Sequence, residues 1–297
     1  MKLVSFVKNG AAAGEPPRLG VLADDASIVD VASDPQLPST MVALFALPGL
    51  LPAIQRKLAA LPRLRRAEVR LCAPVPHPAK NVICVGKNYR AHAKEFQSSG
   101  FDGSSGGETI PEYPAVFTKP STTIIAGGEP IPASADETNS VDYEGELVVV
   151  IGKGGRAIPR ERALDHVFGY TLANDVTSRI TQARHKQWFL GKSADGFCPI
   201  GPAIVTADEV PDPARLRLRT TVNGEVRQDA SAADLIFDIP YLIACISKIM
   251  TLDAGDLIAT GTPEGVGIGF KPPRYLRTGD VVEVTVEEIG TLSNPVN

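Results

Sequence analysis

The 297-residue sequence predicts an α+β fold rich in β-strands, with a small N-terminal α/β module ahead of a larger domain. Three observations lead to this prediction. After residue 80, short β-branched and apolar runs follow one another, separated by glycine, proline, asparagine and aspartate turns. Helical patterns are fewer, which argues against a doubly wound parallel sheet. Pro74, Pro76 and Pro78 remove backbone donors and favour extended neighbours, as is typical of a stiff linker between domains.

The N-terminal module is predicted to occupy residues 1–72, and the proline-rich linker residues 73–80. The module's predicted elements are two short strands and one helix that prolines interrupt: residues 2–7, residues 19–23, and residues 41–61 with breaks at Pro48 and Pro52. This is the pattern of a small mixed unit rather than of a disordered extension.

The larger domain is predicted to run over residues 81–297. Its predicted strands are residues 82–85, 115–117, 147–151, 203–205, 217–222, 257–260 and 281–286, and its predicted helices are residues 159–165, 178–186 and 239–250. Asn223-Gly224 predicts a tight hairpin, because both central positions of such a turn need positive φ. Residues 97–107 are rich in serine and glycine and predict a mobile loop.

Composition and charge exclude some classes of function. An apolar content of 43% is ample for a buried core in a chain of this length. The formal net charge of −4 and the pI of about 5.7 supply no overall positive field, so no nucleic-acid partner is expected. The first residues lack the pattern of a signal or transit peptide, and no apolar run is long enough to span a membrane. We therefore expect a cytoplasmic protein.

The four cysteines are scattered without a CxxC pair. This arrangement predicts reduced core residues rather than a zinc site or a disulfide framework. Cys198 lies near a candidate active-site lysine in the sequence, but a structural role is expected, because reactivity needs an environment that stabilises the thiolate.

Three carboxylates form the first candidate site. Glu144 and Glu146 stand two apart at the start of an apolar β run, so in a strand both point to the same side. Asp175 follows another apolar β-like stretch and can approach from a neighbouring strand end. Three converging carboxylates without basic partners repel one another, and a hard divalent cation such as Mg²⁺ or Mn²⁺ relieves that repulsion. The alternative is that the two glutamates form the solvent face of an ordinary amphipathic strand.

His92 and Glu95 form a second candidate pair. They follow an apolar strand and stand three apart in a predicted helical turn, which puts the imidazole and the carboxylate on one face. Glu95 can then orient the ring and stabilise its protonated form, as proton abstraction from water requires. The alternative is an exposed charge pair. The remaining histidines are expected to be structural: His77, His166 and His185.

Several segments together resemble one family, the fumarylacetoacetate hydrolase superfamily. They follow the family's order over roughly residues 80–295: NVICVGKNYRAHAKE, DYEGELVVVIGKGGRAI, GYTLANDVTSR, QWFLGKSADGFCPIGPAIV, GEVRQ, LIATGTPEGVG and KPPRYLRTGDVVEV. Taken together these motifs are highly specific. FCPIGPAIVT and KPPRYLRTGDVVEVTVEEIG look closest to the group that includes the mitochondrial oxaloacetate tautomerases, although the first residues do not predict a leader to match that location.

The resemblance implies a mixed β-sandwich roll, usually in a homodimer, with one Mg²⁺ or Mn²⁺ per chain bound by Glu144, Glu146 and Asp175. It also implies that His92 and Glu95 sit on a lid that becomes ordered over bound substrate. The further site residues that it implies are an active-site lysine, two polar residues on the helix after the third ligand, and substrate contacts: Lys192; Arg179 and Gln182; Tyr89 and Thr262. The alternative for the lysine, the arginine and the glutamine is ordinary surface exposure.

Two departures from the family concern the substrate pocket. Where many members read Lys-Ser-Phe-Asp-Thr-Phe, this chain has KSADGF at residues 192–197, which removes an aromatic side chain. A long Ser/Gly insertion also follows the lid before Pro114. Gly-Lys-Ser at residues 191–193 is similar to part of a phosphate loop, but Lys186 replaces the required earlier glycine, so we reject a nucleotide site.

The expected activity is hydrolytic cleavage of a carbon–carbon bond in a small β-dicarbonyl, such as an acylpyruvate or fumarylpyruvate, through a metal-bound enolate. His92, oriented by Glu95, would activate the water, while Lys192 and Thr262 would hold the developing oxyanion. The alternative is decarboxylation of oxaloacetate or keto–enol exchange of a 2-oxo acid, because neither requires an attacking water. A second alternative is a catalytically silent binding protein on the same fold.

Overall fold

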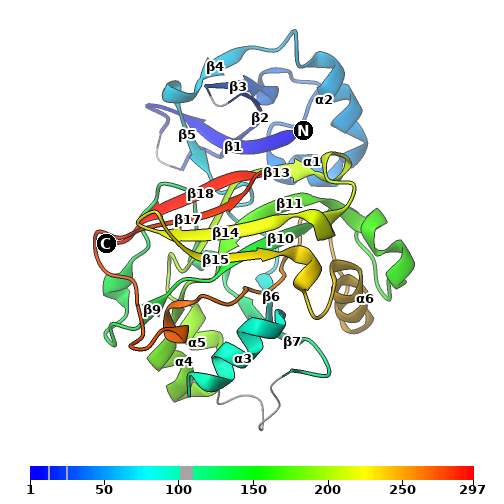
Figure 1. The fold of residues 1–297 in the computed structure, drawn as a ribbon. Helices are drawn as coiled ribbons and strands as arrows, with labels where there is room; N and C mark the ends of the chain where they lie inside the picture. Colours follow the sequence, from blue (N-terminus) through cyan, green and yellow to red (C-terminus); the bar gives the residue numbers. More distant parts are fainter. Residues whose placement is uncertain (13, 25, 101–109) are drawn as a thin grey trace.

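The computed structural model describes residues 1–12, 14–24, 26–100 and 110–297, and it confirms the predicted β-rich α+β fold (Figure 1). A 12-stranded sheet forms its backbone. In spatial order its main path is β4 (Arg63–Arg65), β3 (Ser27–Asp30), β2 (Arg18–Asp24), β1 (Lys2–Lys8), β13 (Cys198–Thr206), β11 (Val167–Asn174), β10 (Gly145–Ile151), β16 (Leu257–Ala259), β6 (Val82–Gly86) and β7 (Ala115–Lys119). Off this path, β5 (Val69–Cys72) pairs with β1, and β8 (Ile124–Ile125) pairs with β13.

A second, four-stranded sheet packs on the first. Its order is β15 (Glu225–Ser231), β14 (Arg217–Val222), β17 (Val281–Val286) and β18 (Gly290–Pro295). A two-stranded pair joins β9 (Val141–Asp142) to β12 (Thr177–Ser178). The α-helices are α1 (Met41–Ala46), α2 (Leu51–Lys57), α3 (Arg90–Ser98), α4 (Arg179–His185), α5 (Phe189–Lys192) and α6 (Ile239–Ile249). In Figure 1, α3, α4 and α5 gather at the lower end, away from the N-terminus.

Strand β10 lies between two hydrophobic cores, which explains why its sequence is continuously apolar instead of alternating between apolar and polar residues. Leu147 and Val149 face the core shared with α6 and the four-stranded sheet, whereas Val148 and Val150 face the core shared with α1 and β2. All seven residues of the strand are buried, because both faces of the sheet are covered. A continuous apolar run is the consequence of burial on two sides.

Most of the predicted elements of the larger domain are confirmed. The hairpin at Asn223-Gly224 joins β14 to β15, with φ values of 53° and 78°. Helix α6 begins after Asp238, whose side chain accepts a hydrogen bond from the amide of Tyr241 at 2.8 Å. The helix predicted at residues 159–165 is instead the 3-10 helix η6 (Arg160–His166).

The predicted helix over residues 41–61 is divided. It forms α1 and α2 with the 3-10 turn η2 (Pro48–Leu50) between them, and α2 ends at Lys57 rather than at residue 61. Pro52 lies in the first turn of α2, where a missing amide costs no hydrogen bond. Of the loop predicted at residues 97–107, residues 97 and 98 belong to α3, and residues 101–107 lie outside the described residues.

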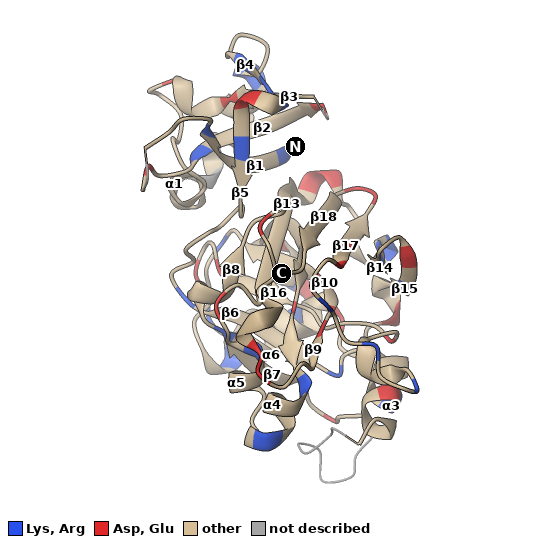
Figure 2. Cartoon of the chain, turned by 90° about the vertical axis from the view of Figure 1, so that its left-hand side faces the viewer, with Lys and Arg blue, Asp and Glu red and all other residues tan. Residues whose placement is uncertain are grey.

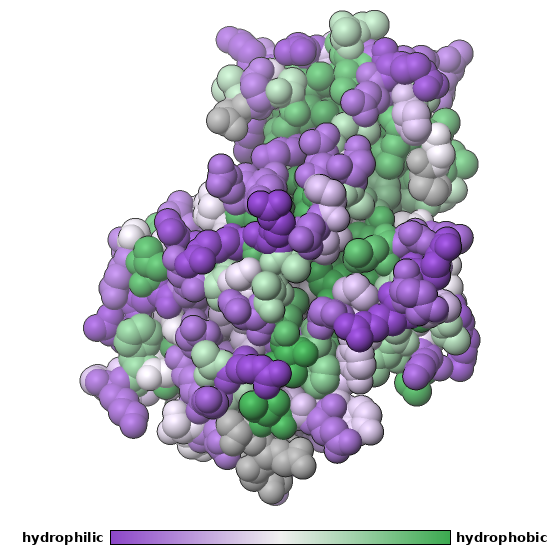
Figure 3. Space-filling model, turned by 45° about the vertical axis from the view of Figure 1, so that its right-hand side comes forward, coloured by the Kyte–Doolittle hydropathy of each residue, from purple (hydrophilic) through white to green (hydrophobic). Residues whose placement is uncertain are grey.

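The N-terminal strands continue the main sheet. Strand β1 pairs with β13 through Lys2↔Val205 and Leu3↔Ile204, and Figure 1 shows β1–β5, α1 and α2 gathered at the upper end. Hydrophobic residues are visible where this part joins the rest (Figure 3), and a hollow of about 740 Å³ lies there between α2 and β11. The boundary at residues 73–80 stays a prediction.

The view in Figure 2 shows no single-sign cluster of charge over the described residues. Figure 2 shows basic and acidic segments interspersed, in keeping with the net charge of −4. Among the described residues, no helix combines the length and the apolar character needed to cross a membrane.

Candidate metal centre and active site

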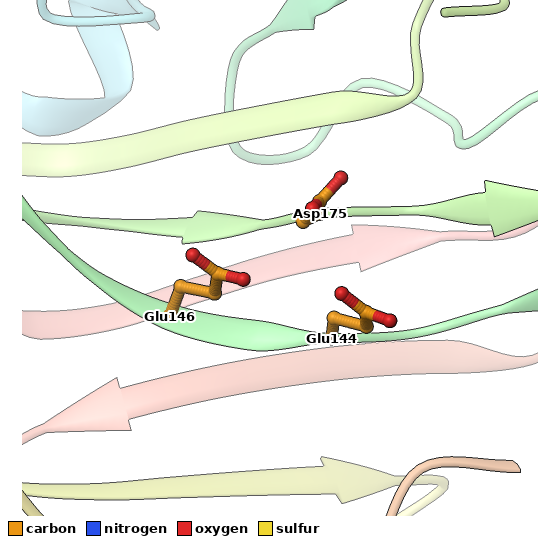
Figure 4. Close-up of side chains that lie close together, drawn as sticks. All are labelled: Glu144, Glu146 and Asp175. Carbon is orange, nitrogen blue, oxygen red and sulfur yellow. The ribbon is translucent and has the colours of Figure 1, made fainter. Parts of the chain in front are cut away.

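Strands β10 and β11 bring the three predicted carboxylates together (Figure 4). The strands are antiparallel, with Gly145 opposite Asn174, and the amide of Asp175 donates to the carbonyl of Glu144 at 2.8 Å. Glu144 and Glu146 project from the same side of their chain segment, as period two predicts. One oxygen from each of the three carboxylates lies within 4.8 Å of the others, and all three residues are buried. The solvent-face alternative for the two glutamates is therefore wrong.

Gly145, between the two glutamates, allows the second sheet to approach. A Cβ atom at this position would lie 2.1 Å from Oγ1 of Thr220 in β14. The Gly145 amide donates to the side chain of Gln228 at 3.0 Å, and that side chain donates to Oγ1 of Thr262 at 2.7 Å. Gln228 therefore connects the strand that carries two predicted metal ligands to a predicted substrate contact.

The expectation that the carboxylates lack basic partners is wrong. Nζ of Lys192 donates to Glu144 at 2.8 Å and to Asp175 at 2.7 Å. Nη1 of Arg179 lies 2.6 Å from Glu144, and Nζ of Lys119 lies 2.6 Å from Asp175. Burial opposes ionisation of Glu144, but the charges of Lys192 and Arg179 outweigh it and lower the pKa of Glu144 to about 2.

Glu146 has a different environment. Its carboxylate accepts a hydrogen bond from the amide of Gly261 at 2.9 Å, and no ion pair to it occurs within the described part of the chain. Burial first, and then the charges of Asp175 and Glu144, raise the pKa of Glu146 well above its ordinary value. A buried cluster of oxygen donors with excess negative charge at one member fits a hard divalent cation.

Helix α3 presents the predicted His92 and Glu95 pair. Nδ1 of His92 lies 3.2 Å from the Glu95 carboxylate, which also accepts a hydrogen bond from the amide of Gly265 at 3.0 Å. His92 is 4% exposed, so the alternative of an exposed charge pair is wrong. The bond to Nδ1 leaves Nε2 of the ring as the nitrogen available to a ligand or to water.

A cavity of about 20 Å³ adjoins the carboxylates, with room for about one water molecule. Most of the predicted site residues line it: Glu144, Glu146, His92, Arg179, Gln182, Lys192 and Thr262. Arg179, Gln182 and Lys192 are buried, so the surface alternative for them is wrong. Nη2 of Arg179 is buried without a hydrogen-bond partner among the described residues, which makes it available to an anionic ligand.

Three predicted site residues do not line this cavity: Glu95, Asp175 and Tyr89. Glu95 contacts His92 and Asp175 contacts Lys192, both of which line it, whereas Tyr89 lies elsewhere. Its buried side chain borders a different hollow, with Asp229 and Leu235. Its role in substrate binding stays a prediction, and the geometry gives it no support.

Comparison with known proteins identifies the family. The family model described as "Fumarylacetoacetate (FAA) hydrolase C-terminal" matches residues 81–297, well over half of the chain. The chain belongs to the fumarylacetoacetate hydrolase family. This confirms the resemblance that the sequence motifs indicated.

Similar members of the fumarylacetoacetate hydrolase family include two named tautomerases. Oxaloacetate tautomerase YisK of Bacillus subtilis (strain 168) is 54% identical over 230 residues, which are 77% of this chain and 74% of that protein. The mitochondrial oxaloacetate tautomerase fahd2 of Xenopus laevis is 40% identical over 304 residues, covering 100% of this chain and 90% of that protein.

A solved structure extends the likeness to a hydrolase of the family. Maleylpyruvate hydrolase from Sphingobium sp. SYK-6, in complex with manganese(II) and pyruvate, superposes with a TM-score of 0.78 at 35% identity. The match covers 100% of this chain and 98% of that one. The chain therefore shares its fold with a family enzyme whose structure holds a divalent metal and a 2-oxo acid.

The charged residues at the site that were not predicted include Lys119 and Asp142. Lys119 is fully buried at the end of β7, where it follows Thr118 and the short apolar run before it. Asp142 is also fully buried, and its carboxylate accepts from Nε of Arg179 at 2.8 Å and from the amides of Gly267 and Ile268 at 2.7 and 3.1 Å. Its position two residues before Glu144 was the available signal.

The cysteines of this family member are free thiols. Cys84 and Cys198 are buried, and burial raises the pKa of Cys198 to about 12. Because the thiolate is the reactive form, Cys198 is inert at neutral pH, which agrees with the expected structural role.

Proposed function

We propose that this chain is a divalent-metal-dependent keto–enol tautomerase of oxaloacetate. The observation that carries the proposal is the enclosed site, in which three buried carboxylates adjoin a cavity of about 20 Å³ bordered by Arg179 and Lys192. Cationic side chains at the border of this site favour a 2-oxo dicarboxylate, whose carboxylates they can pair with, over an uncharged diketone. The two tautomerase relatives, at 54% and 40% identity, support the same substrate.

Arg179 binds one substrate carboxylate in this proposal. Its Nη2 is the buried donor that lacks a partner among the described residues. Its Nε and Nη1 are already held by Asp142 and Glu144, so the guanidinium plane is oriented before substrate arrives. An oriented donor of this kind loses little freedom on binding, which is why it favours a carboxylate at one place in the cavity.

Lys192 and Thr262 stabilise the oxygen at which negative charge develops. Burial opposes the charge of Lys192, but Asp175 and Glu144 raise its pKa, so Nζ stays protonated. Its three protons already go to Glu144, Asp175 and Thr177, so Lys192 stabilises that oxygen through its charge. The hydroxyl oxygen of Thr262 accepts from Gln228 at 2.7 Å, which leaves its own proton for donation to substrate. In the keto-to-enol direction a C–H bond at C3 of the substrate is replaced by an O–H bond at C2.

The predicted ligands would hold one Mg²⁺ or Mn²⁺ per chain: Glu144, Glu146 and Asp175. When bound, the cation supplies Lewis-acid stabilisation of the enolate charge. Their carboxylate oxygens are hard donors that suit either ion.

Hydrolysis of an acylpyruvate is the second candidate, and the His92–Glu95 pair favours it. Glu95 holds Nδ1 of the ring at 3.2 Å, and His92 lines the cavity, so Nε2 can accept a proton from an attacking water. The maleylpyruvate hydrolase structure, at 35% identity, supports this candidate. Tautomerisation and decarboxylation of oxaloacetate need no such water.

A His92→Ala variant separates the candidates. Wild type and variant are assayed with Mg²⁺ for loss of the ultraviolet absorbance of enol-oxaloacetate, for pyruvate formed from oxaloacetate, and for cleavage of acetylpyruvate. The proposal predicts rapid enol–keto exchange that survives the substitution, with little pyruvate. Cleavage of acetylpyruvate that collapses in the variant would establish the hydrolase instead. His185→Ala, at an exposed position on α4, is the matched control and should change none of the three rates.

We also propose that the chain forms a homodimer in the cytoplasm and that residues 1–72 form a module distinct from residues 81–297. Light scattering tests the first point, with a predicted mass twice the 31.4 kDa of one chain. Limited proteolysis tests the second, with predicted cleavage within residues 73–80.

A further inference from the structure

Trp188 is the only tryptophan in the chain, and it lines the cavity at the carboxylate cluster. It lies in the turn between α4, which carries Arg179 and Gln182, and α5, which carries Lys192. The proposed function assigns it no role. Its position among the polar site residues raises the question of what an aromatic ring does there.

Two phenylalanines hold the Trp188 ring edge to face. The ring centroid of Phe117, in β7, lies 5.5 Å away at an interplanar angle of 83°, and that of Phe96, in α3, lies 6.0 Å away at 84°. Both phenylalanines line the same cavity. Edge-to-face contacts of this kind are favourable beyond the apolar area that they bury, so the three rings form one apolar wall.

Gly86 holds the ring from a third side. A Cβ atom at Gly86 would lie 2.0 Å from Cζ3 and 2.6 Å from Cη2 of Trp188, so the indole rests directly on the backbone of β6. Gly86 does not adopt positive φ, which means that space and not backbone conformation requires a glycine here. Trp188 therefore cannot turn toward β6, and turning elsewhere displaces Phe96 or Phe117.

We propose that Trp188 sets the upper limit on substrate size, admitting a short 2-oxo dicarboxylate and excluding acylpyruvates with a bulky acyl group. This inference rests on the function proposed above. The indole is rigid and packed on three sides. A ligand that extends past the carboxylate cluster toward this wall meets a side chain that cannot move aside without displacing its neighbours.

The affinities for a short ligand and for a bulky ligand test the size limit independently of turnover. Calorimetry with saturating Mg²⁺ measures the Kd of oxalate, which is short, and of 4-phenyl-2,4-dioxobutanoate, which carries a phenyl group. In Trp188→Ala the Kd of the phenyl ligand relative to that of oxalate should fall at least about tenfold, the scale on which apolar pockets discriminate by size. Trp188→Leu, which keeps an apolar side chain, should show a smaller shift in the same direction and serves if the alanine variant fails to fold.

Phe189→Ala is the matched control, because Phe189 is the next residue and is 41% exposed. This variant should leave the ratio of the two Kd values unchanged. A ratio that changes less than about twofold in both Trp188 variants overturns the inference.

The tryptophan fluorescence of wild type supplies a second measurement, because Trp188 is the only tryptophan in the chain. Titration of 4-phenyl-2,4-dioxobutanoate, the ligand that meets this wall, into Mg²⁺-loaded protein should change the emission with the midpoint that calorimetry gives, and unchanged emission at saturation contradicts the inference. If oxaloacetate is not turned over but the Kd ratio still shifts, the proposed function fails and the size limit stands. If oxaloacetate is turned over and the ratio does not shift, only the size limit fails.

Discussion

Replacing Glu146 with glutamine should make the protein more stable than wild type in the absence of metal and less stable than wild type in its presence. The side chain is 1% exposed, and burial together with the charges of Asp175 and Glu144 raises its pKa well above the ordinary value. Glutamine has nearly the same shape and keeps an oxygen that accepts from the amide of Gly261. The substitution therefore removes the charge while the packing stays the same.

The direction in which pH changes the free energy of unfolding follows from the protons that Glu146 binds in the folded and unfolded states. Between the ordinary pKa of 4.5 and the raised folded value, the folded state of Glu146 binds more protons than the unfolded state. The free energy of unfolding of the metal-free wild type therefore falls as pH rises through that window, by about 1.4 kcal/mol for each unit by which the pKa is raised. Glutamine does not ionise, so the metal-free variant escapes this loss. At pH 8 it should melt higher than wild type, by about 2 to 4 °C for each kcal/mol recovered.

Bound metal should reverse this order and make wild type more stable than the Glu146→Gln variant. A ligand at 100 times its Kd stabilises the folded state by about 2.7 kcal/mol, and a neutral amide is a poor ligand for a hard cation. The assay is thermal melting at pH 8 in EDTA and in excess Mn²⁺. We expect the variant to be the more stable protein in EDTA and wild type to be the more stable in Mn²⁺. Glu161→Gln, at an exposed position in η6, should melt like wild type in both. A variant that is less stable than wild type in EDTA, or that gains as much from Mn²⁺, would refute the reasoning.

Three further predictions concern packing and burial. Gly86→Ala should destabilise the protein by about 1–3 kcal/mol, because the added methyl group clashes with the Trp188 ring. A double-mutant cycle measured by denaturant unfolding should show a smaller destabilisation when Trp188 is also replaced by alanine. Asp142→Asn breaks a buried ion pair with Arg179, so the free energy of unfolding should fall by about 3–5 kcal/mol and turnover at least tenfold; a melting curve like that of wild type would contradict this. Iodoacetamide at pH 8 should label the half-buried Cys72 and Cys245, but it should not label Cys198 until the protein unfolds. Mass spectrometry of the labelled peptides measures this.

The parts of the site that the sequence predicted are those that local periodicity determines. Glu144 and Glu146 share a side because a strand alternates with period two, and the apolar run behind them marked the strand. His92 and Glu95 meet because a helix places residues three apart on one face. Asp175 was predicted to join them because it follows another apolar β-like stretch, and the family motifs supported that assignment.

The parts that it did not predict depend on the order of strands in the sheet. Lys119, at the end of β7, reaches Asp175 across 56 positions of sequence, and three strands lie between β7 and β11 in the order of the sheet. Periodicity assigns a strand but not its neighbours, so the basic partners of the carboxylates could not be derived. Tyr89 lies at the start of α3 and pairs through its backbone with Leu235, which turns it away from the cavity that the motif suggested.

The central claim is that Glu144, Glu146 and Asp175 hold one divalent cation, and a crystal of the protein grown with Mn²⁺ tests it most directly. An anomalous difference map should contain one peak per chain among the three carboxylates, and the peak should be missing from crystals of Asp175→Asn grown in the same way. A wild-type map without a peak at this place, or with its peak elsewhere in the chain, would contradict the account.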